Sequence, residues 1–163
     1  MEANLKIATL VVQKLKAMGY TVDLLEEFDP RLNQYSALAL VSIHNDSCDY
    51  INDEATGFKV AAPSDSQYQD RSERLEKCLI HRYHEITKLK IHVNTITPDM
   101  TSYHTFDEIS SETTAAIIET GFLNLDEQII RYQPELVADG IVAGIKCFVE
   151  RESVPDDFLN EID

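Results

Sequence analysis

Apolar residues recur every three or four positions in several parts of the chain, which is the spacing of an amphipathic helix. Gly19 follows the first of these segments, as expected where a helix ends. Pro134 opens the last one and suits a first helical turn. The segments predicted to be helices are 5–18, 67–87, 125–132 and 134–150.

Other apolar runs are short, lack the helical repeat and predict strands. The runs 38–43 and 114–119 are almost continuously apolar, which is typical of strands covered on both faces. Weaker strand patterns occupy 20–25 and 57–61. The segment 88–113 shows no clear period, so we expect mainly loop there, with one or two short strands.

Because helices and strands alternate, the pattern predicts an α/β fold. We expect a three-layer helix-sheet-helix domain with a mostly parallel sheet. A chain of 163 residues with 44% hydrophobic content is sufficient for one core. The expected division is a single domain over 1–150 and an acidic tail over 151–163.

The charge balance excludes some partners. The chain has 14 basic and 29 acidic residues, a formal net charge of −15, which disfavours nucleic acid because phosphate contacts need concentrated Lys and Arg. Apolar runs are too short for a membrane span. The segment beginning at Met1 lacks the basic and apolar regions of an export signal.

The three cysteines show no CxxC spacing, so the sequence predicts neither a zinc knuckle nor a disulfide framework. Cys78 and Cys147 fall within helical apolar patterns and are expected to pack in the core. Cys48 lies four residues after His44, but a metal-ligand role for it is disfavoured.

Two of the predicted strands end in residues capable of metal or acid-base chemistry. His44 follows the run 38–43, and Glu119 ends the run 114–119. Open α/β sheets build sites from such residues at the carboxyl ends of their strands. Each residue alone is more often structural, the histidine hydrogen-bonded and the glutamate capping a helix or paired with a cation. Together they indicate a metallohydrolase.

The sequences around these residues, Ser-Ile-His at 42–44 and Glu-Thr-Gly-Phe-Leu at 119–123, resemble those of the zinc-dependent N-acetylmuramoyl-L-alanine amidases. The resemblance runs from about Asn4 to Phe148. It implies that His44 is a Zn²⁺ ligand and that Glu119 is the catalytic carboxylate. It further implies hydrolysis of the amide between N-acetylmuramic acid and L-alanine, with peptidoglycan or muropeptide as substrate, in the cell envelope or outside the cell.

The chain departs from the family at its beginning. In the family, a first strand ending in Gly-His-Gly supplies a second histidine ligand, and a later glutamate supplies a third. Neither has an equivalent here, and catalytic zinc needs about three protein ligands. We therefore expect an amino-terminally incomplete amidase domain with an incomplete zinc site and absent or impaired activity. The alternatives are a noncatalytic binding or regulatory module that lost its metal, and, more remotely, another α/β zinc hydrolase.

Further polar residues near these motifs are weaker candidates. His81 and His84 lie three apart on a predicted helix, but their order is not that of zinc proteases and exposure is the favoured interpretation. His104 lies in a region that approaches the substrate in the family and is a candidate for substrate contact. Asn45 and Ser47 are expected to orient His44 by hydrogen bonds.

Overall fold

The structure, a computed structural model, describes residues 2–92 and 95–155. Its described sheet has three strands in the order β1-β3-β2, with β1 at Ala39–Asp46, β2 at Lys59–Ala61 and β3 at Thr114–Phe122. β1 runs parallel to β3, whereas β2 runs antiparallel to it. The α/β class is therefore confirmed. The expectation of a mostly parallel sheet is not, because this sheet is mixed.

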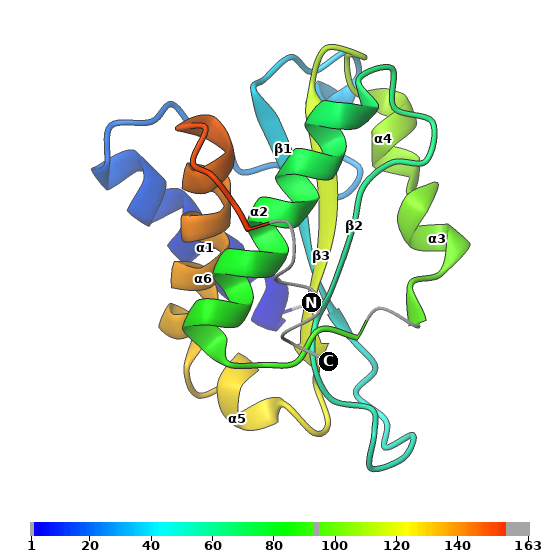
Figure 1. The fold of residues 1–163 in the computed structure, drawn as a ribbon, viewed down its shortest axis with the longest axis vertical. Coiled ribbons are helices and arrows are strands. Elements are labelled where there is room, and N and C mark those ends of the chain that lie inside the picture. Colours follow the sequence, from blue (N-terminus) through cyan, green and yellow to red (C-terminus); the bar gives the residue numbers. More distant parts are fainter. Residues whose placement is uncertain (1, 93–94, 156–163) are drawn as a thin grey trace.

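The four predicted helices all form (Figure 1). Two short helices also occur inside 88–113, where mainly loop and short strands were predicted. Among the described residues of this segment, β pairing is limited to an isolated bridge from Ile91 to Phe58. The helices are α1 (Glu2–Ala17), α2 (Gln69–Thr87), α3 (Pro98–Thr101), α4 (His104–Glu108), α5 (Glu127–Ile130) and α6 (Pro134–Val149). A 3₁₀ turn spans Pro30–Leu32.

Alternation along β3 divides the core between the two faces of the sheet. Ala116 and Ile118 join the main apolar cluster with the inner sides of α1, α2 and α6. Ala115 and Ile117 face the other way, toward smaller clusters that include Met100 of α3 and Phe106 of α4. Helices thus lie on both faces of the sheet (Figure 1), and the burial of both explains the continuous apolar run.

The predicted strand over 20–25 is wrong. These residues are described and adopt no strand, because no neighbouring strand pairs with their backbone. Side chains hold the segment instead: the Tyr35 hydroxyl donates to Asp23 at 2.7 Å, and the Tyr20 hydroxyl donates to Glu150 at 2.6 Å. The apolar alternation here serves packing rather than pairing.

Helices α2 and α6 pack closely because glycines on α6 face large residues of α2. A Cβ atom added at Gly144 would lie 2.8 Å from the Cα atom of Leu79, and one at Gly140 would lie 2.8 Å from the Tyr83 ring. The Tyr83 hydroxyl in turn donates to the backbone carbonyl of Thr120 at 2.7 Å. This contact links the helix pair to the carboxyl end of β3.

The same helix pair is joined covalently by a disulfide between Cys78 and Cys147. Both cysteines are fully buried, so their predicted place in the core is confirmed. The expectation that no disulfide is formed was wrong. Sequence spacing does not reveal that the two helices pack together so that cysteines 69 residues apart meet.

The first residues after α6 lie against α2. Arg82 forms an ion pair with Glu152 at 2.8 Å, and Arg74 donates to the Glu152 carbonyl. The remainder of the predicted acidic tail, 156–163, lies outside the described residues. Among the helices that the structure describes, none combines the length and the apolar character that a membrane crossing requires.

Replacing both cysteines with alanine, in a Cys78→Ala/Cys147→Ala variant, is expected to destabilise the fold by about 4 kcal/mol, since the crosslink closes a loop of 69 residues in the unfolded chain. This corresponds to a drop in Tm of about 10 °C. Circular dichroism melts with and without a thiol reductant measure it. Reductant should lower the Tm of the parent protein and leave the variant unchanged; a parent Tm insensitive to reductant would contradict the disulfide.

Candidate functional site

The register of the sheet brings three polar side chains into one row. His44 of β1 pairs with Glu119 of β3, and Glu119 pairs with Lys59 of β2. Paired residues on neighbouring strands project to the same face of a sheet. The two residues predicted from sequence therefore lie side by side, and the structure adds Lys59 on the far side of Glu119.

The chain around β2 is positioned by Asp126, just after the end of β3. Its carboxylate accepts hydrogen bonds from the backbone amides of Gly57 and Phe122, each at 2.9 Å, and from the Thr56 hydroxyl. Gly121 has a φ of +148°, and a Cβ atom there would lie 3.0 Å from the Asp126 carboxylate. A glycine at this position thus allows the approach that fixes where β2 begins.

Lys59 is a buried cation between two carboxylates. Its side chain is 8% exposed, and its ammonium donates a hydrogen bond to Asp46. The Glu119 Oε2 atom lies 3.1 Å from the same ammonium, in an ion pair that lacks the orientation of a hydrogen bond. The Phe122 ring lies 5.1 Å from the Lys59 nitrogen.

Sequence reasoning missed Lys59 and Asp46. A signal was present, because Lys59 stands between Phe58 and Val60 in an otherwise apolar strand. A lysine in such a run is almost never fully buried unless it is paired. The pairing partner, however, depends on an antiparallel contact between segments about sixty residues apart, which the pattern alone does not specify.

Burial and mutual charge determine the ionisation of Glu119, Asp46 and Lys59. Burial raises the pKa of Glu119, and the neighbouring Asp46 carboxylate raises it further, against the opposing effect of Lys59. Burial alone would also raise the pKa of Asp46, but its hydrogen bonds from Lys59 and Ser47 outweigh burial and lower it. Burial would lower the pKa of Lys59, yet the two carboxylates raise it. Lys59 is therefore charged at neutral pH.

His44 lies on the other side of Glu119 and is half-buried. The edge of its ring meets Tyr103, with ring centroids 5.2 Å apart. Burial lowers its pKa, which favours the neutral imidazole, the form in which histidine binds metals. These properties agree with the ligand role predicted for His44, and that role remains a prediction.

His104 lies on the other side of Tyr103 from His44. Its ring centroid is 4.5 Å from that of Tyr103 and 4.9 Å from that of Phe28, on which it stacks. Its Nδ1 atom is 2.9 Å from a Glu108 oxygen. Phe28 is 76% exposed, so a line of aromatic rings leads from the surface to His44. Substrate contact by His104 remains a prediction that this placement permits.

The orienting role predicted for Asn45 and Ser47 is not supported. The Asn45 side chain faces the opposite side of the sheet, where it contacts Asn4 of α1 and accepts a hydrogen bond from Thr120. The Ser47 hydroxyl bonds to the backbone of Asp49. Asn45 therefore links α1 to the strand pair, one residue along from His44.

The other candidate residues do not join the site. His84 makes a 2.7 Å hydrogen bond with the Leu89 carbonyl at the end of α2, and His81 lies 3.4 Å from Glu85 of the same helix. Cys48 is an exposed free thiol. None of these residues belongs to the row of His44, Glu119 and Lys59.

The described residues do not fit a zinc centre. Across 2–92 and 95–155, no three His, Cys, Asp or Glu side chains come together as a group able to hold a metal ion. A zinc site needs about three protein ligands. Beside Glu119 there is instead the ammonium of Lys59, which carries no lone pair and cannot ligate a cation.

Comparison with known proteins identifies the family. The family profile described as N-acetylmuramoyl-L-alanine amidase matches residues 1–147. The chain therefore belongs to the N-acetylmuramoyl-L-alanine amidase family, as the sequence resemblance indicated. A search of curated proteins found no match.

Solved structures share the fold at low sequence identity. The CwlD amidase from Clostridioides difficile, in complex with the GerS lipoprotein, is 18% identical with a TM-score of 0.68, over 93% of this chain and 86% of that one. An N-acetylmuramoyl-L-alanine amidase from Clostridium difficile 630 is 22% identical with a TM-score of 0.69, over 93% and 84%. The catalytic domain of CwlV from Bacillus (Paenibacillus) polymyxa is 20% identical with a TM-score of 0.66, over 91% and 84%.

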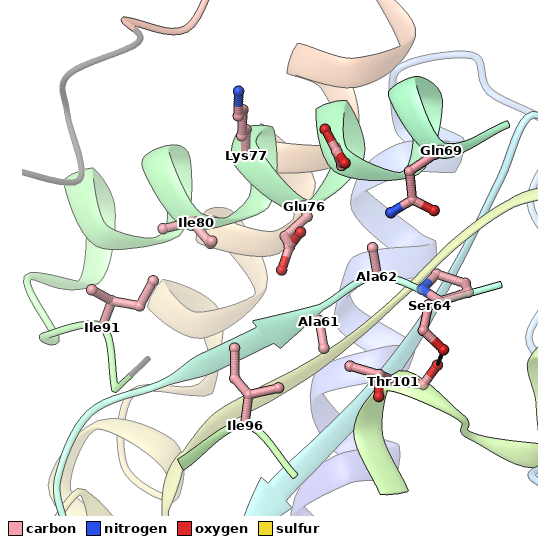
Figure 2. A pocket seen from close by; sticks show the side chains of 12 residues that line it. Ala61, Ala62, Ser64, Gln69, Glu76, Lys77, Ile80, Ile91, Ile96 and Thr101 are labelled. Carbon is pink, nitrogen blue, oxygen red and sulfur yellow. Dashed lines mark hydrogen bonds between the residues drawn. The ribbon is translucent and has the colours of Figure 1, made fainter. Parts of the chain in front are cut away.

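A cavity of about 460 Å³ lies between α2, the end of β2 and the segment that leads into α3. Figure 2 shows the Glu76 side chain pointing from α2 toward Ala61 and Ala62. Isoleucines 80, 91 and 96 also line this cavity. Burial, with a contribution from Glu73, raises the pKa of Glu76 to about 7, although the Ala62 backbone amide hydrogen-bonds to it.

Glu76 therefore makes stability depend on pH. Its pKa is higher in the folded protein than the ordinary value of 4.5, so the folded state favours the neutral acid. The stability that the neutral Glu76 side chain contributes to the folded protein is fully present below the pKa of this group in the unfolded chain. It is lost as pH rises through about 7. A Glu76→Gln variant, which keeps an acceptor for the Ala62 amide, should be more stable than the parent at pH 8, by up to about 3 kcal/mol.

Urea unfolding at pH 8 and at pH 4.5 measures this difference. The advantage of Glu76→Gln should shrink toward zero at the lower pH. Glu73→Gln serves as a control because it removes a nearby charge without removing the buried one. An advantage of Glu76→Gln that is equal at both pH values would contradict the raised pKa.

Proposed function

We propose that this domain acts on peptidoglycan, at the amide bond between N-acetylmuramic acid and L-alanine. Membership of the amidase family over residues 1–147 supports the substrate class. The observation that carries the proposal is the parallel register of His44 with Glu119 at the carboxyl ends of β1 and β3. Ligands bind at this edge in open α/β sheets.

In a complete site of this family, His44 would be a metal ligand and Glu119 the catalytic carboxylate. The chemistry that zinc would supply in such a complete site is polarisation of the scissile carbonyl and activation of water. Burial raises the pKa of Glu119, as a general base near neutral pH requires, and burial keeps His44 neutral. The chain's described residues, however, gather too few ligands for zinc. We therefore propose that this chain by itself hydrolyses the amide only weakly.

A second candidate function is a noncatalytic module that binds peptidoglycan or regulates an active amidase. The observation that favours it is the ion pair between Lys59 and Glu119, which engages the carboxylate that would otherwise accept a proton. Both candidates use residues 1–150 as a single domain and the same row of His44, Glu119 and Lys59. They differ in whether any amide bond is broken.

The proposed location is the cell envelope or the outside of the cell. The family acts on the cell wall, and the buried disulfide between Cys78 and Cys147 supports the same location, because disulfides persist in oxidising compartments. Zinc is the metal proposed for a complete site, and peptidoglycan or muropeptide is the proposed ligand.

Incubation of the chain with purified insoluble peptidoglycan and ZnCl₂ tests these proposals. Amidase cleavage frees the amino group of L-alanine, so labelling of new amino termini measures hydrolysis, and sedimentation measures binding. If the parent releases L-alanine amines, Glu119→Gln should reduce the rate by about 100-fold or more, since a general base contributes about that much. The matched control Glu54→Gln changes an exposed carboxylate and should leave the rate unchanged.

The outcomes separate the two candidates. Sedimentation with peptidoglycan but no amine release identifies the binding module. Release that is equal in the parent and in Glu119→Gln would show that Glu119 is not the catalytic carboxylate. Neither sedimentation nor release would refute both functions.

A further inference from the structure

The group at the centre of the candidate site is a lysine. The ammonium of Lys59 hydrogen-bonds Asp46 and lies 3.1 Å from Glu119, and its side chain is only 8% exposed. Burying a lysine costs free energy, because its ammonium loses its hydration. The two carboxylates compensate that loss.

The arrangement is fixed by the fold rather than by flexible side chains. Glu119 and Lys59 are paired positions of β3 and β2, and Asp46 lies opposite Phe122 after an irregularity in the pairing of β1. Phe122, 4% exposed, places its ring 5.1 Å from the ammonium. Three strands therefore contribute to a closed charge cluster that water reaches poorly.

This cluster conflicts with zinc binding. A divalent cation near Glu119 would meet the positive charge of Lys59 at close range, where screening by water is weak. The ammonium also donates a hydrogen bond to the Asp46 carboxylate, whose oxygens are potential metal ligands at the same end of the sheet. The carboxylates of Glu119 and Asp46 are thus already paired with a cation that belongs to the chain.

We propose that Lys59 is a built-in cation: its ammonium neutralises Asp46 and Glu119, positions the Glu119 carboxylate and excludes a divalent metal from this part of the site. The inference rests on the ion pairs alone and requires no peptidoglycan substrate. Lys59 is a positioning residue here, since it acts through Glu119. Its removal should leave two carboxylates close together without a counter-charge, a place that favours an added cation.

Thermal melts in EDTA and in excess ZnCl₂ or MgCl₂ test the proposal. The Tm of the parent should be the same in all three solutions. Lys59→Met, which keeps the apolar stem, should melt about 10 °C lower in EDTA because breaking a buried ion pair costs several kcal/mol. At least one of the two metals should restore part of this loss. Lys59→Arg keeps the positive charge and should not respond to metal.

The matched control is Lys16→Met, which removes an exposed lysine of α1 and should change neither the Tm nor the response to metal. A purely structural role of Lys59 predicts destabilisation without recovery by either metal, and that result would overturn the proposal.

Equilibrium dialysis of the parent with ZnCl₂ provides a measurement that does not depend on the folding of any variant. The proposal predicts that His44→Ala leaves zinc uptake unchanged, because any zinc taken up by the parent is bound elsewhere. Stoichiometric zinc that is lost in His44→Ala would overturn the proposal. This result is distinct from a failure of peptidoglycan cleavage or binding.

Discussion

The parallel hydrogen bonding of β1 to β3 is the constraint on which the candidate site depends. It places His44 opposite Glu119, and a slip of one residue would turn one of the two side chains to the opposite face of the sheet. The register is held from both faces, since Ile118 packs toward α2 and α6 while Ile117 packs toward α3. The chemistry at the strand ends is therefore positioned by apolar packing several residues away.

The same packing determines the charge at the site. β2 adds Lys59 beside Glu119, and the Asp126 carboxylate holds the chain before β2 by accepting the Gly57 amide. Because burial raises the free energy of each isolated charge, the groups are stable only as a set. A family fold built around a metal can in this way keep its shape while a lysine supplies positive charge beside the carboxylate. Fold membership and catalytic competence are then separate properties of the chain.

The spacing of apolar residues predicted the helices and strands whose formation depends on residues close together in the sequence. The helical repeats identified the long helices α1, α2 and α6 and the short helix α5, and the apolar runs ending at His44 and Glu119 identified the strands that carry these residues. Long-range pairing was not predictable in the same way. The segment 20–25 alternates like a strand but has no strand beside it, Lys59 acquires its partners only through β3, and the disulfide joins cysteines that meet only when α2 packs on α6. The short helices α3 and α4 lie in the segment 88–113, where the sequence shows no clear period.

In this proposal a lysine ammonium, not a metal ion, provides the positive charge beside Glu119 in this chain. A crystal structure of the protein grown in ZnCl₂, with anomalous diffraction recorded at the zinc absorption edge, tests it directly. The Lys59 nitrogen should remain in contact with both Asp46 and Glu119, without an anomalous peak between Glu119 and His44. A zinc ion bound to His44, with the Lys59 side chain turned away from Glu119, would contradict it.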